Sequence, residues 1–343
     1  MKKSLQRWLV SFVRVYFTIL FGWVIGYWLY GDQNGYLALV HPFAAWLFTP
    51  LPAIWLFWYW KRGADIFLPA AAASLLFVLF WGSLFLPNFS SFPADGKHLT
   101  VMTYNLRGSN KQFEDVAQVL TLEDADVVLL QELNLEMADY LGETFRGAYP
   151  YRILAAEEGV TGLGVFSKYP LTPRKRALPL SWAGSPQVFD LDLDGENVAM
   201  INFHTWAPGI GPRQVVEPGF RHREAQARLL VKFAQVENNP VILAGDANTA
   251  PLSEAYKILA AELQDSWLEA GFGMGYTFPG GNDLRSRVTK IDYMQAFGFP
   301  EWFIRIDYIF VSKEWKVVKS FLAEPDGYSD HRPLISVIVL GEE

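Results

Sequence analysis

The chain of 343 residues has no cysteine, which excludes disulfide bonds, thiolate metal sites and cysteine nucleophiles. It has only five histidines, so any imidazole chemistry depends on few positions. A basic excess is also missing: the net charge is −7, and residues 97–343 carry 23 basic and 33 acidic side chains. Because contacts to phosphates dominate the affinity of nonspecific nucleic-acid binders, this balance argues against a high-affinity DNA-binding protein.

Hydrophobic residues, in contrast, make up 51% of the chain, and 16% of it is aromatic. The excess lies in the first ninety residues, where apolar runs cover residues 8–30, 36–60 and 64–86. A helix needs about 20 residues, at about 1.5 Å each, to cross about 30 Å of hydrocarbon, so each run is long enough. We therefore expect three transmembrane helices, with residues 8–86 in contact with the lipid bilayer. A kink or break in the second run is predicted by its prolines, Pro42, Pro50 and Pro52.

Basic residues flank these runs unevenly. Lys2, Lys3 and Arg7 precede the first run, Lys61 and Arg62 separate the second from the third, and the connection between the first two has no base. By the positive-inside rule, we expect a multi-pass cell-membrane protein with its N-terminus in the cytoplasm and its chain after the third run outside. A cleaved signal peptide is the alternative, but no small-x-small cleavage site closes the first run.

The rest of the chain divides into a short linker and a large domain. Residues 87–98 are polar and contain two prolines, which predicts a linker between a membrane anchor of residues 1–86 and a domain of residues 99–343. A dozen residues cannot carry this domain far, so we expect it close to the membrane surface. No protein partner can be inferred from either part.

Within the large domain, apolar strands alternate with amphipathic helices. Helices are expected near residues 111–122, 134–146, 221–236 and 253–263, and strands near residues 151–155, 162–168, 187–194 and 315–323. The turn Asp194-Gly195-Glu196-Asn197 between alternating runs predicts a hairpin. Because hairpins and helices are mixed, an α/β fold of two packed sheets flanked by helices fits better than one parallel sheet.

Polar side chains follow several of the apolar strands. The residues concerned are Asn105, Glu132, His204, Asp246, Asn248, Asp307, Asp330 and His331. A carboxylate can hold a divalent metal and an imidazole can donate to a phosphate oxygen, so such groups at strand ends suit phosphoester hydrolysis. Each residue alone has a structural alternative, such as a capped turn or a solvated surface position. Their repetition at strand ends favours a functional site.

The strands with these polar ends form an ordered set. The stretches are Val101–Asn105, Val127–Glu132, Ala199–His204, Val241–Asn248, Arg305–Phe310 and Tyr328–Leu334. In this order they resemble the endonuclease/exonuclease/phosphatase superfamily, which includes DNase I, abasic-site endonucleases, neutral sphingomyelinases and inositol-phosphate phosphatases. The resemblance covers roughly residues 97–340. It implies a four-layer α/β/β/α sandwich (DNase I-like) and divalent-metal-dependent hydrolysis of phosphoester bonds.

The resemblance also implies roles for the strand-end residues. Glu132 and Asp330, together with Asn105, would hold the metal, and oxygen ligands without cysteine favour Mg²⁺, or Mn²⁺, over zinc. Asn105 would position a metal-binding carboxylate or bind a phosphate oxygen of the substrate. Asp246 would orient or deprotonate the attacking water, and the amide of Asn248 would donate to the phosphate.

Both histidines of the set receive acid–base roles. His204 is the candidate general acid, and His331 is the phosphate-binding or acid–base partner. Asp307 would hydrogen-bond one imidazole and hold its tautomer. The stretch Lys290-Ile291-Asp292-Tyr293 looks similar, so Asp292 remains an alternative to Asp307.

Substrate identity stays open at this level. Membrane tethering and an acidic domain favour a phospholipid or a small phosphoester, with extracellular nucleic acid as the second choice. A non-catalytic membrane receptor, using the sandwich as a binding module, is the alternative of another class. Residues 206–220 are expected to form a substrate-determining loop. Three arginines lie in or next to this loop: Arg213, Arg221 and Arg223. They either bind an anionic group or form the solvated face of a helix.

Overall fold

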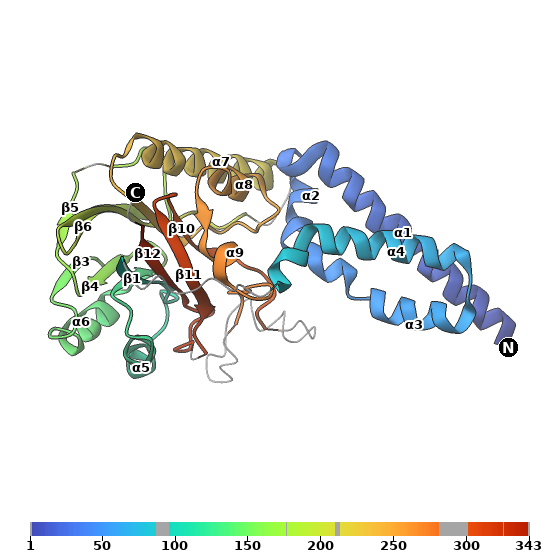
Figure 1. Cartoon of the computed structure of the whole chain (residues 1–343), viewed down its shortest axis with the longest axis horizontal. Helices are drawn as coiled ribbons and strands as arrows, with labels where there is room; N and C mark the ends of the chain where they lie inside the picture. The colour runs from blue at the N-terminus through green and yellow to red at the C-terminus, as the bar shows by residue number, and fades with distance from the viewer. Residues whose placement is uncertain are drawn as a thin grey trace.

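The structure is a computed structural model that describes residues 2–86, 96–175, 177–209, 213–280, 301–324 and 326–341. Residues 2–86 form an elongated helical arm, and the described residues from 96 onward form an α/β body at one end of it (Figure 1). The N-terminus lies at the tip of the arm farthest from the body (Figure 1). The C-terminus lies on the side of the body that is turned away from the arm (Figure 1).

The arm combines α-helices and short 3-10 helices: α1 (Lys2–Tyr30), η1 (Gly31–Gln33), α2 (Gly35–Val40), η2 (His41–Phe48), α3 (Leu51–Lys61), α4 (Ala64–Trp81) and η3 (Gly82–Phe85). Two helical stretches, Leu5–Gln33 and Ala64–Phe85, are long and apolar enough to cross a membrane. The bent pair Gly35–Phe48 and Leu51–Lys61 makes a third span if it is counted as one.

The break in the second apolar run is confirmed. The two halves of this run are bent by 43°, and Thr49 and Pro50 lie between them. Proline lacks the backbone N–H that a continuous helix needs, and its ring clashes with the preceding turn. The basic segments, at the start of α1 and at the connection between α3 and α4, lie together at the tip of the arm away from the body (Figure 1). This is the arrangement that the expected membrane orientation requires, while the orientation itself stays a prediction.

The first sheet has six strands in the order β11-β12-β1-β2-β4-β3. In that order their bounds are Trp315–Leu322, Leu334–Leu340, Lys97–Asn105, Val127–Gln131, Leu163–Ser167 and Tyr151–Ala155. β1 and β2 run parallel, and the other neighbours are antiparallel. The carboxyl ends of β1 and β2 therefore lie at the same edge of the sheet.

The second sheet has six strands in the order β5-β6-β7-β8-β10-β9. Their bounds are Leu171–Pro173, Gly184–Leu193, Glu196–His204, Val241–Asp246, Asp307–Val311 and Gln264–Asp265. Only β7 and β8 run parallel. The predicted hairpin joins β6 to β7 through Asp194 and Gly195, whose φ angles are 51° and 90°, as a two-residue turn of this kind requires.

Helices cover the outer faces of both sheets, which gives the expected four layers. The helices of the body are α5 (Phe113–Glu123), α6 (Leu135–Thr144), α7 (Arg213–Val236), α8 (Glu254–Ala260) and α9 (Ser266–Ala270). Leu120 of α5 and Leu141 of α6 join a buried cluster with Val128 of the first sheet. Leu230 of α7 and Leu259 of α8 do the same with the second sheet. The α/β/β/α sandwich is confirmed.

Two of the boundaries that differ from the sequence expectation concern the junction with the arm. β1 begins at Lys97, so the end of the linker predicted over residues 87–98 is already strand, while residues 87–95 lie outside the described residues. α7 begins at Arg213, so the second half of the loop expected over residues 206–220 is helical. The reason is tertiary: Val216 and Phe220 of this extra helix are buried against Ala38 of the arm.

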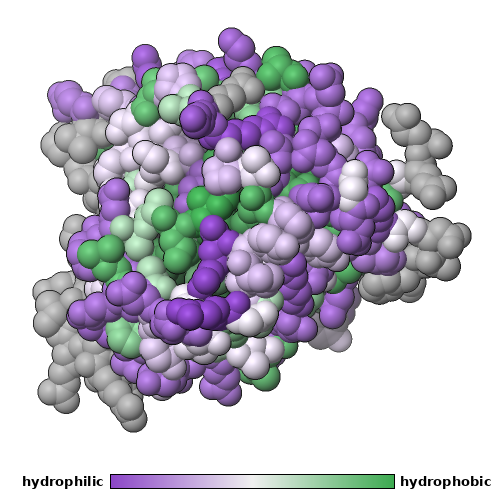
Figure 2. Space-filling model, turned by 90° about the vertical axis from the view of Figure 1, so that its left-hand side faces the viewer, coloured by the Kyte–Doolittle hydropathy of each residue, from purple (hydrophilic) through white to green (hydrophobic). Residues whose placement is uncertain are grey.

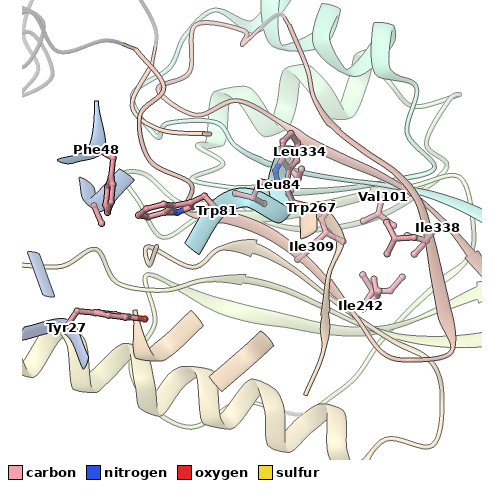
Figure 3. Packing of buried hydrophobic residues seen from close by; sticks show 14 of the residues in the cluster. Tyr27, Phe48, Trp81, Leu84, Val101, Ile242, Trp267, Ile309, Leu334 and Ile338 are labelled. Atoms are coloured by element: carbon pink, nitrogen blue, oxygen red, sulfur yellow. The ribbon is translucent and has the colours of Figure 1, made fainter. Parts of the chain in front are cut away.

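One apolar cluster joins the arm to the space between the sheets. Figure 3 shows Leu84, at the end of the arm, beside Trp267 of α9, and Trp81 one turn before it. From there the cluster continues to Ile309 and Val101, which come from different sheets (Figure 3). The arm is therefore packed on the body, in addition to being joined to it through the chain.

The surfaces of the two parts differ in polarity. Most of the exposed large apolar side chains among the described residues belong to the arm, for example Phe12, Trp60 and Leu79. Figure 2 views the body end of the molecule and shows mainly hydrophilic side chains around a smaller apolar area. The extended apolar exposure of the arm marks a surface that is covered by lipid or by another molecule.

Candidate active site

In the first sheet, three neighbouring strands bring polar residues to one edge. β1 ends at Asn105, and Glu132 directly follows the parallel strand β2. β12 pairs antiparallel with β1, so Asp330 and His331, which precede β12, arrive at the same edge.

In the second sheet, strand register gathers the remaining residues. His204 at the end of β7 pairs with Asp246 at the end of β8, and Asp246 pairs with Asp307 at the start of β10. Asn248 lies two residues farther along the chain. The two edges meet, because Nδ2 of Asn105 in the first sheet donates to Oδ2 of Asp246 in the second over 3.1 Å.

Asn105 and Glu132 form the part of the site contributed by β1 and β2. Asn105 is buried, and its Nδ2 also donates to Oε1 of Glu132 over 3.2 Å. Its Oδ1 accepts the backbone N–H of Arg107, and Oε2 of Glu132 accepts the N–H of Gly108 over 2.8 Å. Asn105 thus presents N–H groups to the carboxylates and holds them in place. Direct metal contact through its oxygen stays a prediction.

The backbone is unusual where these strands end. Glu132 and Asn248 have φ angles of 54° and 45°, and non-glycine residues with positive φ concentrate at functional sites. Gly245 precedes Asp246, and a Cβ there would lie 1.9 Å from the carbonyl oxygen of Phe203. Only glycine therefore allows β8 to approach β7 this closely beside the site.

His204 lies between the carboxylates of both sheets. Its Nδ1 donates to the carbonyl of Val160 over 3.1 Å, and its Nε2 lies 3.4 Å from Oδ2 of Asp246 and 4.0 Å from Oε1 of Glu132. Burial lowers the pKa of His204, but the hydrogen bond and charge of Asp246, together with the charge of Glu132, outweigh burial and raise it. The protonated imidazole is therefore favoured, which suits a proton donor.

Asp246 is buried at the centre of the site. Its Oδ1 accepts the backbone N–H of Asn248 over 2.8 Å, and the side-chain Nδ2 of Asn248 lies 3.3 Å from Oδ2. Burial raises the pKa of Asp246, but the hydrogen bond with His204 and the charge of His331 act more strongly and lower it. The carboxylate therefore stays ionised, which suits a proton acceptor.

His331 is held by Asp307. Its Nδ1 lies 2.9 Å from Oδ2 of Asp307, and its Nε2 lies 3.8 Å from Oδ2 of Asp246. The ring of Phe278 packs on the imidazole with centroids 4.8 Å apart. Burial lowers the pKa of His331, but the charge and hydrogen bond of Asp307 raise it to about 10. Asp307 is thus the carboxylate in contact with this imidazole, while the alternative Asp292 lies outside the described residues.

The donor atoms of the site fit a divalent cation. Burial and the negative charge of Glu132 raise the pKa of Asp330, so these two carboxylates repel each other in a way that a cation between them would relieve. Oδ1 of Asp307 is buried without a hydrogen-bond partner. By distance alone, Asp246, Asp307 and His331 also form a possible ligand group, with atoms within 4.8 Å of one another. There, however, the hydrogen bond to Asp307 already occupies Nδ1 of His331.

Several supporting residues were not foreseen from the sequence. The hydroxyl of Ser329 donates to the carbonyl of Asn105 over 2.7 Å and accepts the N–H of His331 over 3.0 Å. The hydroxyl of Thr277 accepts the N–H of Asp307 over 3.4 Å. Ser329 is next to a predicted site residue and was within reach of sequence reasoning. Thr277 carried no signal, because its contact is made only by the folded chain.

The three arginines near residue 220 have different environments. Arg223 is buried, its guanidinium lies 4.5 Å from the ring centre of Phe220, and its Nη1 lies 3.5 Å from the carbonyl oxygen of Trp206. Burial lowers the pKa of Arg223 to about 10. Arg221 is exposed, and the side chain of Arg213 lies outside the described residues. Arg223 is therefore part of the packing beneath Trp206 rather than of a solvated helix face.

Known proteins share this fold. The sequence model of the Endonuclease/Exonuclease/phosphatase family matches residues 102–331, whereas no curated protein was found to match the chain. Truncated Caenorhabditis elegans TDP2 is 17% identical, with 71% of this chain and 98% of that chain covered and a TM-score of 0.54.

Two further solved structures are similar to the chain. D. rerio TDP2 complexed with single strand DNA product is 18% identical, with 70% and 98% covered and a TM-score of 0.52. The endonuclease/exonuclease/phosphatase from Beutenbergia cavernae is 21% identical, with 71% and 72% covered and a TM-score of 0.51. Because the family model matches residues 102–331, about two thirds of the chain and the part that contains every catalytic candidate, the chain belongs to the endonuclease/exonuclease/phosphatase family, whose members hydrolyse phosphoester bonds.

Proposed function

We propose that this protein is a membrane-tethered, divalent-metal-dependent phosphodiesterase or phosphatase that acts on a phospholipid or another small phosphoester outside the cytoplasm. The observation that carries the proposal is the meeting of two opposed sheet edges. The Asn105 amide of one edge lies within hydrogen-bond distance of Asp246 on the other, and the imidazoles of His204 and His331 both face the same Asp246 oxygen.

The chemistry divides among these residues as follows. Asp246, kept ionised, accepts a proton from the attacking water, and Asn248 and His331 hold the phosphate. His204, kept protonated, donates its proton to the leaving oxygen. Glu132 and Asp330, with Asn105 behind them, would hold Mg²⁺ or Mn²⁺. When bound, such a cation neutralises charge on the phosphate oxygens.

The chain just after the loop of Asp246 contacts the arm, which supports a membrane-borne substrate. Pro251 and Leu252 follow the loop of Asp246, and with Trp81 and Leu84 of the arm they border a cavity of about 30 Å³. A phosphoester carried by a lipid at the membrane surface would therefore be presented close to the site. The acidic balance of residues 97–343 adds to this argument, because it disfavours a long polyanion.

A panel of phosphoesters tests the proposal. The full chain in detergent micelles is offered phospholipid in mixed micelles, bis(4-nitrophenyl) phosphate, 4-nitrophenyl phosphate and supercoiled plasmid, each with Mg²⁺ and with EDTA. Turnover of a phospholipid or small ester that needs Mg²⁺ and exceeds plasmid nicking is expected. If no phosphoester is turned over although Mg²⁺ binds, the protein is a receptor and the proposal fails.

A membrane-anchored nuclease for extracellular nucleic acid is the second candidate. One specific observation favours it: the D. rerio TDP2 structure of the same fold is a complex with single strand DNA product. Plasmid nicking that is faster than the turnover of every small ester in the same panel would select this candidate.

A further inference from the structure

We propose that the membrane arm is a working part of the active-site scaffold, and that Trp46 of η2 is a positioning residue for His331 and Asp307. The kinetic part of this proposal rests on the hydrolase function proposed above. The structural part does not, so the two can fail separately.

Trp46 reaches from the arm to two segments of the body. Its Nε1 donates to the carbonyl of Phe303 over 2.9 Å, although 257 positions separate the two residues. Its indole stacks on the ring of Tyr276, with centroids 5.9 Å apart and planes within 20° of parallel. Phe43, one turn earlier in η2, packs on Phe303 with ring centroids 5.6 Å apart.

Tyr276 and Phe303 belong to the two halves of a small backbone clasp, which we define as residues 276–278 paired with residues 303–304. Phe278 and Ile304 form an isolated antiparallel bridge with N–H to carbonyl distances of 3.0 and 2.9 Å. The N–H of Phe303 also donates to the carbonyl of Phe278 over 3.1 Å. Trp46 therefore touches both halves of the clasp at once, through a hydrogen bond on one side and a stacked ring on the other.

The clasp in turn holds the catalytic pair. The ring of Phe278 lies against the imidazole of His331, and the hydroxyl of Thr277 accepts the N–H of Asp307. The carbonyl of Thr277 also accepts the N–H of Arg332, directly after His331, over 2.9 Å. A displacement of the clasp would therefore move both members of the His331–Asp307 pair.

A second arm residue contacts the chain that follows Asn248. Oδ2 of Asp32 accepts the backbone N–H of Glu254 over 2.7 Å, at the first residue of α8. The other oxygen of Asp32 lies 3.3 Å from Nδ1 of His41, and both side chains are buried. Since Glu254 lies six residues after Asn248, the arm contacts the chain that follows this site residue as well as the clasp. An arm that served only as a membrane tether would not need the contacts that Trp46 and Asp32 make with the body.

Trp46 acts through His331 and Asp307, whose placement matters most when charge builds up on the phosphate in the transition state. Its effect should therefore appear in turnover more than in substrate binding. Small misplacements of catalytic groups cost large factors in rate, about 100-fold for 1 Å. Trp46→Phe keeps an aromatic ring and removes only the N–H donor, and Trp46→Ala removes both contacts. Trp60→Phe is the matched control, because Trp60 lies in the last turn of α3 and is 81% exposed.

The experiment uses the full chain in detergent with a soluble phosphodiester and Mg²⁺, with rates normalised to the folded fraction from circular dichroism. Trp46→Phe is expected to lower kcat about tenfold, and Trp46→Ala about 100-fold, with KM within about twofold of the wild type. Trp60→Phe is expected to change neither. A kcat of Trp46→Phe equal to that of Trp60→Phe overturns the positioning role.

Amide hydrogen exchange supplies a readout that needs no turnover. Trp46→Phe is expected to speed exchange in residues 277–280 and 303–307, but not in the central strand β1, relative to Trp60→Phe. Unchanged exchange in those segments overturns the proposal whatever the enzyme hydrolyses. If exchange becomes faster but the protein hydrolyses no phosphoester, the structural role of Trp46 is supported and only the hydrolase function is refuted.

Discussion

The Nδ1 atom of His331 lies 2.9 Å from Oδ2 of Asp307, and both residues are buried. This contact fixes the ring so that the opposite nitrogen, Nε2, points toward Asp246 at the centre of the site. The second oxygen of Asp307 has no hydrogen-bond partner, so the carboxylate serves the imidazole and leaves one oxygen available to the site. A carboxylate that orients an imidazole in this way also stabilises its protonated form.

The first prediction concerns this pair. Asp307→Asn is expected to lower kcat about 100-fold, because the imidazole loses the charge that holds its orientation and its proton. Since both residues act as one unit, the double variant Asp307→Asn/His331→Ala should be little worse than His331→Ala alone. The four rates of the cycle are measured on a soluble phosphodiester. Additive losses in log kcat would show that the two residues act independently.

The second prediction concerns the proposed proton acceptor. Asp246→Asn keeps the shape of the side chain but removes its negative charge, so kcat should fall by about 100-fold or more. Asp139→Asn, in an exposed position of α6, is the control and should leave kcat unchanged. Unchanged hydrolysis by Asp246→Asn would assign water activation to another group.

The third prediction concerns the metal. EDTA should abolish hydrolysis, and Mg²⁺ or Mn²⁺ should restore it, because the carboxylates of the site offer oxygen ligands. Glu132→Gln should raise the Mg²⁺ concentration needed for half-maximal activity at least about tenfold, a loss of the size seen when groups around a metal site are changed. Glu136→Gln, an exposed residue of α6 four positions away, should not. Full activity in EDTA would refute metal dependence.

The fourth prediction concerns topology, and the lack of cysteine makes it simple to test. A membrane-impermeant maleimide added to intact cells should label Asp139→Cys, in the body, but not Ser4→Cys, near the N-terminus. After lysis both should react. Labelling of Ser4→Cys alone in intact cells would invert the expected orientation, which follows from basic residues at the tip of the arm.

The fifth prediction concerns the core between the sheets. Oδ1 of Asn202 in β7 accepts from Gln131 in β2 over 2.7 Å, and its Nδ2 donates to the carbonyls of Leu130 and Gly164. Asn202→Ala removes these buried hydrogen bonds between the two sheets and should cost about 2–3 kcal/mol. The midpoint of thermal unfolding should fall by about 5 °C or more. The exposed Asn197→Ala serves as the control, and an equal midpoint for both variants would contradict the prediction.

Sequence reasoning reached most of the residues that meet at the candidate site for a physical reason. Buried strands read as short apolar runs, and a polar residue directly after such a run lies at the edge of a sheet. Asn105, Glu132 and Asp246 were identified in this way. For His331, sequence reasoning left two candidate partners, Asp307 and Asp292. It could not decide between them, because the carboxylate that meets the ring depends on the path of the chain between the sheets.

The supporting contacts lay beyond the sequence. Thr277 and Phe278 follow no apolar strand and belong to no motif, yet they contact Asp307 and His331 directly. The helical start of α7 was missed because its stability comes from burial against the arm, and intrinsic propensity is overridden by such packing.

The sequence by itself determined the composition of the arm, its break at the prolines, the order of the strands and the kinds of side chain at their ends. These are local properties, set by hydrophobic periodicity and by backbone chemistry within a few residues. Only the tertiary structure decided that the arm packs against the body and that Trp46 reaches Tyr276 and Phe303. Contacts between residues more than two hundred positions apart depend on how completed elements pack, and no short stretch of sequence encodes that packing.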